Sequence, residues 1–401
     1  MTHQLTNHLI TASVGRFDDD HFNGMVWIKD GVRAVKFALD PNFQQAFPQL
    51  TKPAKSLYLS SVRALLQIQA QPAQLWRFQN RPSIDAGNGY VTIDDRQAPA
   101  IKFTQDGLIY HDWGHNQPDN WGTLLLEVGK GIEAGWPVLE KGQNQAIPLG
   151  SIMQEVTSYV VGLRTERLVC RSIWEHKKAW SSYSTRRIVL AGLEKTEQIW
   201  PELITDSRKR AYPLKVTRQQ LEDAIGRLRE KVKEHFPADY TDSEGHESSA
   251  DLASIVVLND IDLPDDESSE ILERARELEN RQGFYRYLGD PWKQGRAEAK
   301  WTMGKPIMAR YYFRLARRLY EQGKAREAYR SLGRGLDKID DMIAIINTYG
   351  YIPEIFEDRQ KDGVYRPNNN ELAWTHGDII EATSAGIVAL ETSERFYQKV
   401  A

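Results

Sequence analysis

Several acidic residues of this chain share a short motif with a tryptophan. An indole ring stacks on the apolar face of a sugar, and a carboxylate accepts hydrogen bonds from sugar hydroxyl groups. The sequence has 11 tryptophans, so these residue types suit a carbohydrate site. Each pairing also fits a plainer arrangement, in which the tryptophan is part of the core and the acid caps a helix. The acids are Asp30 in MVWIKDG, Asp119 in WGHNQPDNW, Glu175 in SIWEHKKAW, Asp290 in YRYLGDPW, and Glu354, which shares its neighbourhood with Trp374.

Several other chemistries lack their motifs. The sequence has no GxxxxGK[ST] phosphate loop, no GxSxG elbow, no HExxH helix and no CxxC pair. His111 and His115, in HDWGH, would have metal-pair spacing on a helix, but Gly114 and the strand-like flank favour a loop. We therefore predict no metal and no cofactor.

Composition limits the class of protein and of partner. At 401 residues and 41% hydrophobic content, the chain can bury a large core, and we predict one domain over residues 1–401. A net charge of −3 without a basic stripe argues against nucleic acid and favours a small molecule or a neutral polymer. Cys170 is the single cysteine, and the sequence has no signal-like start and no bilayer-spanning run. We predict a cytoplasmic protein without a membrane segment.

The periodicity of the apolar residues predicts a mostly helical chain. Segment 303–322 carries one apolar stripe, Gly323 ends it, and 325–346 resumes the same period, as in a helical hairpin. Paired helices of this kind can close into a ring. Strand-like alternation predicts a short hairpin or meander at 88–110, and the acidic, serine-rich stretch 236–251 predicts a solvated loop. Further helices are predicted at 31–46, 53–71, 119–134, 147–164, 183–200, 217–234, 250–259, 266–281 and 373–396.

A series of motifs gives the chain a specific resemblance. In order, they are LITAS, VWIKDG, IKF with WGHNQPD, SIWE, ADLASIVVL with GFYRYLGD, the helix pair after KWTMGKP, and YIPE with LAWTH. Together they resemble the catalytic domain of glycoside hydrolase family 15, the glucoamylase family, which also includes a related domain of the phosphorylase kinase α and β subunits. The resemblance runs from about residue 9 to about residue 396. It implies an all-α fold, an (α/α)6 barrel of inner and outer helices with the active pocket at one end.

The resemblance also implies catalytic roles for two glutamates. Glu175, in IWE, matches the general acid of the family, and Glu354, in IPE, matches its general base. An inverting glycosidase needs this pair, because one carboxylic acid protonates the leaving oxygen while a carboxylate activates water on the opposite face of the sugar. The two carboxyl groups are then expected to lie roughly 6.5 to 9.5 Å apart.

The remaining matches imply a substrate-binding set. Asp30 matches an aspartate that holds sugar hydroxyls, and Arg286, in FYRY, matches an arginine that clamps the terminal sugar. A structural role competes with the binding role at each position. The predicted set is Trp27, Lys29, Asp30, Trp113, Asp119, Trp174, Arg286 and Trp374.

Three departures from the family pattern bear on activity. Lys29 stands where the family commonly has arginine, and this removes a bidentate contact. Phe22 or Asn23 stands where the family often has tyrosine, and His176 replaces the second glutamate of fungal-like members. The sequence favours an inverting exo-acting glucosidase that releases β-glucose from α-linked gluco-oligosaccharides or soluble glucan. The alternative is a phosphorylase-kinase-like glucan-binding or regulatory module with little turnover.

Overall fold

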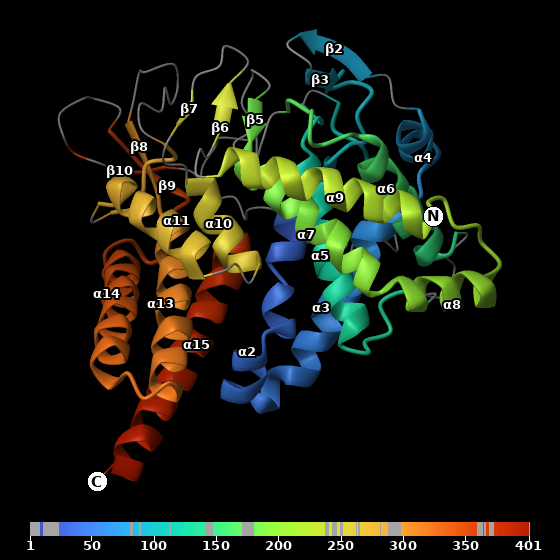
Figure 1. Cartoon of the computed structure of the whole chain (residues 1–401). Helices are drawn as coiled ribbons and strands as arrows, with labels where there is room; N and C mark the ends of the chain where they lie inside the picture. The colour runs from blue at the N-terminus through green and yellow to red at the C-terminus, as the bar shows by residue number, and fades with distance from the viewer. Residues whose placement is uncertain are drawn as a thin grey trace. The chain divides into compact units, whose positions relative to one another are not determined.

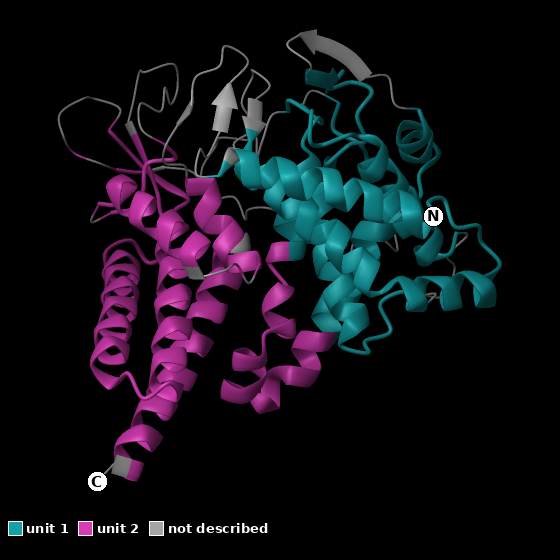
Figure 2. Cartoon of the chain, viewed as in Figure 1, with its two compact units in different colours: residues 1–12, 24–32, 56–249 teal, residues 13–23, 33–55, 250–401 magenta. Residues whose placement is uncertain are grey.

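The chain divides into two compact units, which are described separately. The computed structural model describes residues 9–10, 24–80, 83–87, 90–111, 114–140, 147–170, 180–236, 240–242, 247–248, 252–261, 263, 265–280, 282–287, 298–358, 364, 366–368 and 373–400. Unit 1 comprises residues 1–12, 24–32 and 56–249, and unit 2 comprises residues 13–23, 33–55 and 250–401 (Figures 1 and 2). Both units are discontinuous in sequence. One domain over residues 1–401 stays a prediction.

Unit 1 consists of helices with three small antiparallel sheets. The sheets are β1 (Met25–Trp27) with β4 (Lys102–Thr104), β2 (Ser83–Gly87) with β3 (Tyr90–Ile93), and β5 (Trp180–Ser182) with β6 (Tyr240–Asp242) and β7 (Glu247–Ser248). The helices are α1 (Ile28–Arg33), α3 (Thr51–Ile68), α4 (Pro72–Gln79), α5 (Pro118–Glu133), α6 (Leu149–Gly162), α7 (Tyr183–Gln198), α8 (Trp200–Arg210) and α9 (Arg218–His235). Arg33 of α1 and residues 51–55 of α3 are assigned to unit 2.

Unit 2 is built around three long helices and one three-stranded sheet. Helix α13 (Gly304–Glu321) packs between α14 (Ala325–Tyr349) and α15 (Ala373–Val400) (Figure 1). Phe313 of α13, Leu332 of α14 and Ala385 of α15 share one core cluster. The other helices are α2 (Pro41–Ala46), α10 (Leu252–Asp260) and α11 (Asp265–Leu278), with 3₁₀ turns at Lys36–Leu39 and Pro48–Leu50. The antiparallel sheet has the order β10 (Arg366–Asn368), β9 (Ile355–Asp358), β8 (Glu298–Trp301).

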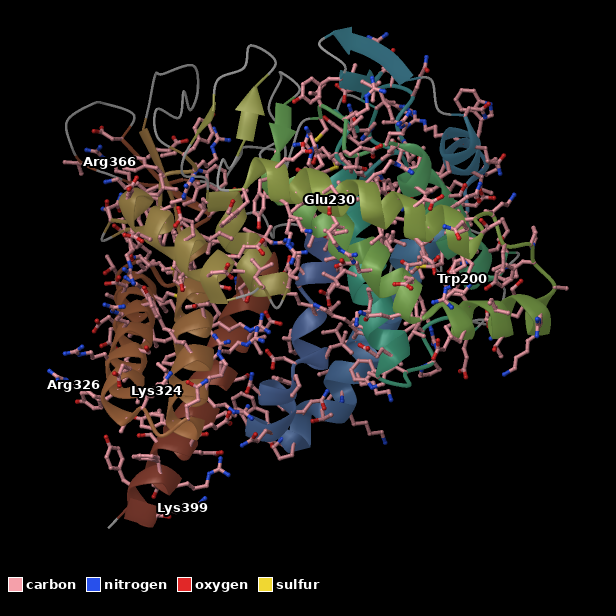
Figure 3. All side chains as sticks on the ribbon, in the orientation of Figure 1. Trp200, Glu230, Lys324, Arg326, Arg366 and Lys399 are labelled. Atoms are coloured by element: carbon pink, nitrogen blue, oxygen red, sulfur yellow. The ribbon has the colours of Figure 1, made fainter. Side chains whose placement is uncertain are left out.

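The predicted all-α class is confirmed, with local differences. Segment 31–46 is not one helix, because Asp40 accepts a hydrogen bond from the Asn42 amide and Pro41 occupies the first turn, so α2 starts anew. Helices α4 and α8 were not predicted; α8 begins at Trp200, followed by Pro201 (Figure 3). Short strands also form outside 88–110, in the β5–β7 and β8–β10 sheets. No helix among the described residues is both long and apolar enough to cross a bilayer.

Two glycines allow α5 and α7 of unit 1 to pack closely. A Cβ atom on Gly122 would lie 2.8 Å from the backbone of Val189, and one on Gly192 would lie 2.5 Å from the Gly122 carbonyl oxygen. Both contacts are with backbone atoms, which cannot move aside as a side chain does. The close approach of the two helices therefore depends on these residues.

Two Gly→Ala substitutions, one at this contact and one away from it, should change stability in opposite directions. Gly122→Ala should lower the free energy of unfolding by roughly 1–3 kcal/mol or more, because the added methyl group forces α5 and α7 apart. Gly226→Ala, in α9, meets nothing within 4 Å and should raise the free energy of unfolding by about 0.5–1 kcal/mol through helix propensity. Urea unfolding followed by circular dichroism measures both. A stable Gly122→Ala variant would contradict the contact.

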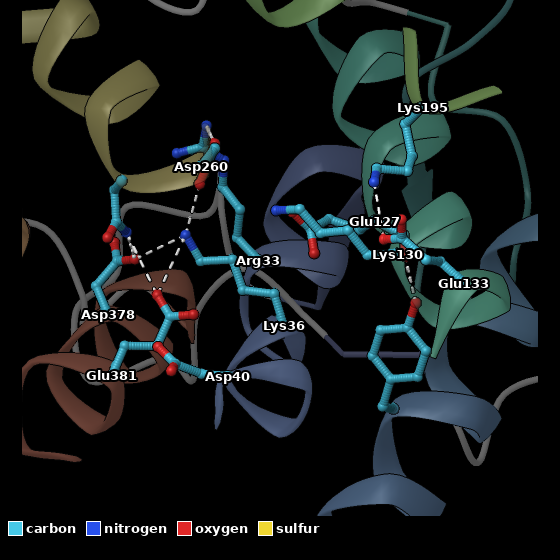
Figure 4. Close-up of polar contacts among 12 residues, drawn as sticks. Arg33, Lys36, Asp40, Glu127, Lys130, Glu133, Lys195, Asp260, Asp378 and Glu381 are labelled. Carbon is cyan, nitrogen blue, oxygen red and sulfur yellow. Dashed lines mark hydrogen bonds and ion pairs between the residues drawn. The ribbon is translucent and has the colours of Figure 1, made fainter. Parts of the chain in front are cut away.

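A network of buried charges lies within unit 2. Its cations and carboxylates come from the segment 33–40, from α10, from α13 and from α15. Figure 4 shows the members from the segment 33–40, α10 and α15. The Lys36 ammonium lies 2.6 Å from Asp260 and 3.2 Å from Asp378. The Arg310 guanidinium lies 2.7 Å from Asp40 and 2.9 Å from Glu381. Arg33 also pairs with Asp260, so every member has at least one charged partner.

The network holds more acid than base. Its three cations, Arg33, Lys36 and Arg310, face four carboxylates, Asp40, Asp260, Asp378 and Glu381. Burial raises the pKa of Glu381 to about 7, although Arg310 and Lys36 act in the opposite direction, and burial also raises the pKa of Asp378. Among these seven described residues, one proton held by a carboxyl group balances the charges.

The raised pKa predicts that stability falls as the pH rises. The folded chain holds the Glu381 proton more tightly than the unfolded chain, so its contribution is complete below the unfolded value of 4.5 and is lost as the pH rises through about 7. We expect Tm to drop by about one or two degrees from pH 6.5 to 8, and Glu381→Gln to remove most of that drop. Differential scanning calorimetry measures it.

The range from pH 6.5 to 8 separates the effect of Glu381 on Tm from that of His115, whose pKa is also shifted. Burial lowers the pKa of His115 to about 4, so its contribution is complete above 6.5 and is lost as the pH falls toward 4. A Tm that stays constant from pH 6.5 to 8 in the unmodified chain would rule out the assignment to Glu381.

Candidate functional site

Strand β1 and helix α1 carry the predicted residues of the VWIKDG motif. Trp27 ends β1 and lies opposite Lys102 of β4, and the Ile28 amide then donates to the Ile101 carbonyl oxygen at 3.1 Å. Helix α1 starts at Ile28 directly after the strand, so Lys29 and Asp30 occupy its first turn. Trp27, Lys29 and Asp30 are all buried. The strand-to-helix junction therefore fixes the three side chains through backbone pairing.

The first turn of α5 meets Lys29. The Lys29 amide donates to Asn120 Oδ1 at 3.1 Å, and its ammonium donates to Gln117 Oε1 at 3.3 Å. The same ammonium lies 3.7 Å from Asp119 Oδ2. Pro118 starts α5, which suits a helix start, and a negative charge at Asp119 is favoured there by the helix dipole. The structure thus brings the predicted residues Lys29 and Asp119 together.

The Asp119 carboxylate has an unusual environment. It is 4% exposed, and neither oxygen accepts a hydrogen bond from any residue that the structure describes. Its contact with Lys29, at 3.7 Å, is longer than a hydrogen bond. Buried polar atoms in folded proteins nearly always have hydrogen-bond partners, so such an atom calls for an explanation. A ligand rich in hydroxyl groups would supply the donors.

A buried lysine stacks against the Trp27 ring. Lys102 Nζ lies 4.3 Å from the Trp27 ring centroid and 4.2 Å from the Tyr110 ring centroid. Both distances are within cation–π range, and Lys102 is fully buried. The ammonium therefore fixes the orientation of the indole from one side.

In unit 2, Glu354 is held at the start of strand β9. The Thr302 amide donates to the Glu354 carbonyl oxygen at 3.0 Å, and the Thr302 hydroxyl donates to the Pro353 carbonyl oxygen at 2.5 Å. Strand β8 pairs with β9, with Trp301 opposite Ile355. Glu354 is buried, and its backbone is fixed on both sides of the Pro353–Glu354 bond. This rigidity suits a group that must hold a water molecule in one place.

Arg286 lies beside strand β8. Phe284 and Trp301 exchange backbone hydrogen bonds of 2.9 and 2.7 Å, which places the segment after Phe284 along the edge of β8. The approach requires glycine at 283, where a Cβ atom would lie 2.5 Å from the Trp301 carbonyl oxygen. The Arg286 guanidinium lies 5.4 Å from the Trp301 ring centroid. Trp301 thus holds the segment that carries Arg286, and the next residue, Thr302, holds the backbone of Glu354.

The other predicted residues lie outside the described part of the chain. These are the proposed acid Glu175, the aromatic residues Trp113 and Trp174, and also Asp290 and the departures Phe22, Asn23 and His176. Trp374 is the second residue of α15, and its side chain is likewise outside the description. The carboxyl separation predicted for Glu175 and Glu354 therefore stays a prediction.

Three residues join these clusters although the sequence alone did not select them. Lys102 and Trp301 stand in the motifs IKF and KWTMGKP, but nothing local indicates that they contact Trp27 and Arg286. Gln117, which binds Lys29, lies two residues before Asp119 in WGHNQPD, so its motif was the available signal. Among the described residues, no three His, Cys, Asp or Glu side chains are grouped as metal ligands.

Comparison with known proteins places the fold. No protein-family model and no curated protein matches the sequence. A glycosidase structure matches with a TM-score of 0.60 and 14% identity, over 96% of this chain and 97% of that one. Glucoamylase from Saccharomycopsis fibuligera matches with a TM-score of 0.67 and 13% identity, over 96% of this chain and 89% of that one.

A third structure is longer than this chain. A bacterial glucoamylase complexed with acarbose matches with a TM-score of 0.55 and 12% identity, over 98% of this chain but 55% of its own. This chain thus spans about half of that protein. The three similarities confirm the predicted fold class: the chain is similar in fold to glucoamylases and is an all-α, six-hairpin barrel.

Proposed function

We propose that the protein is an inverting exo-acting glucosidase that hydrolyses α-glucosidic bonds of soluble oligosaccharides or glucan and releases β-glucose. In this proposal Glu354 takes a proton from water, and the water oxygen attacks the anomeric carbon opposite the leaving group. Glu175 gives its proton to the departing glycosidic oxygen as the bond to the anomeric carbon breaks. The substrate is a glycoside, and the reaction needs no cofactor.

The observation that carries the proposal is the buried Asp119 carboxylate beside Lys29. Its oxygens accept no hydrogen bond from the described residues, and the Lys29 ammonium lies 3.7 Å from one of them. Sugar hydroxyl groups are donors that suit such acceptors. The Trp27 ring, held by Lys102, belongs to the same group of residues, and an indole is a ring type that stacks on sugar faces.

The arrangement in unit 2 supports the proposed roles of Glu354 and Arg286. Both side chains are buried, and both are positioned through strand β8. A carboxylate base and a guanidinium donor are the residue types that an exo-acting glycosidase uses at the terminal sugar. The fold similarity to glucoamylases supports a glycoside hydrolase activity in this proposal.

Lys29 favours a second candidate, a glucan-binding module with little turnover. The ammonium of Lys29 is already directed to Gln117 and Asp119, so it does not offer the two-pronged clamp of an arginine. A weaker hold on the terminal sugar lowers transition-state binding. The retained pair Glu175 and Glu354 favours the enzyme.

The single buried cysteine, Cys170, fits a cytoplasmic location.

One experiment separates the two candidates. The purified chain is incubated with maltooligosaccharides, isomaltooligosaccharides and α,α-linked disaccharides, while proton NMR follows the first-formed anomer. With the malto- and isomaltooligosaccharides, early appearance of β-glucose from the non-reducing end supports the inverting glucosidase, and early α-glucose from that end rules out inversion. An α,α-linked disaccharide gives one β- and one α-glucose on inversion and two α-glucoses on retention. Oligosaccharide binding by calorimetry, with no glucose released over a long incubation, supports the binding module instead.

A further inference from the structure

Helix α14 exposes an apolar stripe with a seven-residue repeat. Tyr329, Leu336 and Ile343 are 66%, 38% and 47% exposed. Ile346 and Tyr349 of the same helix are also exposed, although Tyr349 packs on Phe356, so five of the thirteen large exposed apolar residues described lie on this one helix. Exposed apolar residues concentrated on one helix indicate an interaction surface. The side of α14 that carries Gly335 and Met342 is buried in its own chain, and Leu332, at the edge of the stripe, packs on α13 and α15.

The charges beside this stripe are segregated along the helix. Arg326 and Arg330 lie in its first half, and Asp337 and Asp340 lie in its second half. All four are exposed and form no ion pair with a described residue. Surface charges on helices are usually paired at i,i+3 or i,i+4, as Lys231 is with Glu234. Glu327 and Lys338 carry the other sign in the two halves, so the separation of sign holds for the four charges beside the stripe.

The residues of the stripe mirror one another about Gly333. Arg326 and Asp340 stand seven residues before and after it. Tyr329 lies four residues before and Leu336 three after, while Arg330 lies three before and Asp337 four after. In an antiparallel pair of identical helices that cross at Gly333, each of these residues therefore meets its counterpart. The sequence of the helix is complementary to itself.

Gly333 itself has no role in the packing of its own chain. A Cβ atom there would meet nothing within 4 Å, whereas one on Gly335 would lie 2.5 Å from the Phe313 ring. A glycine inside a helix destabilises it by about 0.5–1 kcal/mol relative to alanine. Gly335 is thus explained by the internal packing and Gly333 is not. A second helix that crosses closely at this point would explain it, because interaxial distances of roughly 8–10 Å depend on small residues at the contact.

We propose that α14 is the interface of a two-fold symmetric dimer, in which a second copy of this chain packs its α14 antiparallel against the first at Gly333. Tyr329 then packs on the partner copy's Leu336, and Arg326 pairs with its Asp340. A two-fold interface repeats every contact, so both sets form twice. In Figure 3 the Arg326 side chain extends away from α14 on the side opposite α13, as this pairing requires. The proposal is independent of the activity proposed above.

A glycine substitution tests the close crossing. Gly333→Leu should abolish the dimer in sedimentation velocity, since its side chain holds the helices apart, while Tm stays equal or rises through helix propensity. The matched control is Gly226→Leu, at another exposed helical glycine with nothing within 4 Å, which should remain dimeric. A Gly333→Leu protein that is still a dimer, or an unmodified chain that is monomeric at its highest attainable concentration, overturns the proposal.

A charge exchange tests the register. Arg326→Asp and Asp340→Arg should each raise the dimer dissociation constant on the order of tenfold or more, because two attractive pairs become repulsive. The double variant should recover the dimer, since each new arginine again meets an aspartate. Failure of the double variant to recover overturns the antiparallel register.

A cross-link tests the position of the axis. The sole native cysteine, Cys170, is buried, so a surface thiol can be introduced without competition. Gly333→Cys should form a disulfide-linked dimer under mild oxidation, seen on a non-reducing gel, because the two thiols meet at the two-fold axis. Gly226→Cys should not. Equal cross-linking of both variants overturns the placement of the axis.

Discussion

Replacing Glu354 by glutamine is expected to lower kcat for α-glucoside hydrolysis by about 10²–10⁴-fold, the usual contribution of a general base. The neutral amide has nearly the same shape but cannot accept a proton from water. Because Thr302 holds this segment through the Pro353 and Glu354 carbonyl oxygens, the backbone position should be unchanged. Glucose release from maltooligosaccharides measures the loss, and Tm verifies that the fold is retained.

A substrate with a different leaving group distinguishes the base from the acid. α-Glucosyl fluoride needs no proton on its leaving group, so Glu175→Gln should retain turnover of the fluoride while losing the oligosaccharide. Glu354→Gln should lose both, since water must still be activated. A third variant, Glu354→Ala, should form β-glucosyl azide when azide is added, because the anion attacks the anomeric carbon directly. Wild-type turnover in both glutamine variants would end the assignment of the two roles.

The second large effect concerns stability and the buried network of unit 2. Replacing Lys36 by methionine is expected to lower the free energy of unfolding by about 3–5 kcal/mol, the usual result of removing one partner of a buried ion pair. Its ammonium lies within 3.4 Å of three carboxylates, Asp260, Asp378 and Glu381, and the pKa of Lys36 is raised because these charges outweigh its burial. Without it, those acids must either remain charged in the core or take up protons.

A surface lysine gives the matched comparison. Lys231 in α9 pairs with Glu234 at 2.8 Å, but this pair lies at the surface. Lys231→Met should change the free energy of unfolding by about 1 kcal/mol or less. Urea unfolding at pH 7 measures both variants. If the two losses were equal, the network around Lys36 would have no special weight in the stability of unit 2.

The long helices could be predicted from the sequence, because their signal is local. The apolar stripe from Ile307 to Leu319 indicates α13 within two residues of its observed ends. Short strands were harder, since Trp301 of β8 pairs with Ile355 of β9 more than fifty residues later, and no local pattern encodes that pairing. The start of α2 was missed for a different reason, as Asp40 and Pro41 interrupt an otherwise continuous stripe.

The candidate site shows the same difference between features with a local sequence signal and contacts between distant residues. Residue type and motif selected Asp119 and Glu354, and the structure buries both side chains, while their roles stay predictions. Lys102 was not selected, because its cation–π contact with Trp27 results from the register between β1 and β4. The network of unit 2 was also missed, because Arg33 and Asp260 are separated by 227 positions. Contacts between distant segments require the fold itself.

The discontinuity of unit 2 bears on how the chain is made. One of its early parts, residues 33–55, leaves the ribosome long before residues 250–401. At about 5–20 residues per second, the 227 positions between Arg33 and Asp260 correspond to a delay of roughly 10–45 s. During that interval Arg33, Lys36 and Asp40 remain hydrated on an unfinished segment. Unit 2 therefore completes its folding only after synthesis is nearly over, and a chain truncated before α15 would leave the charges of its early residues without Asp378 and Glu381.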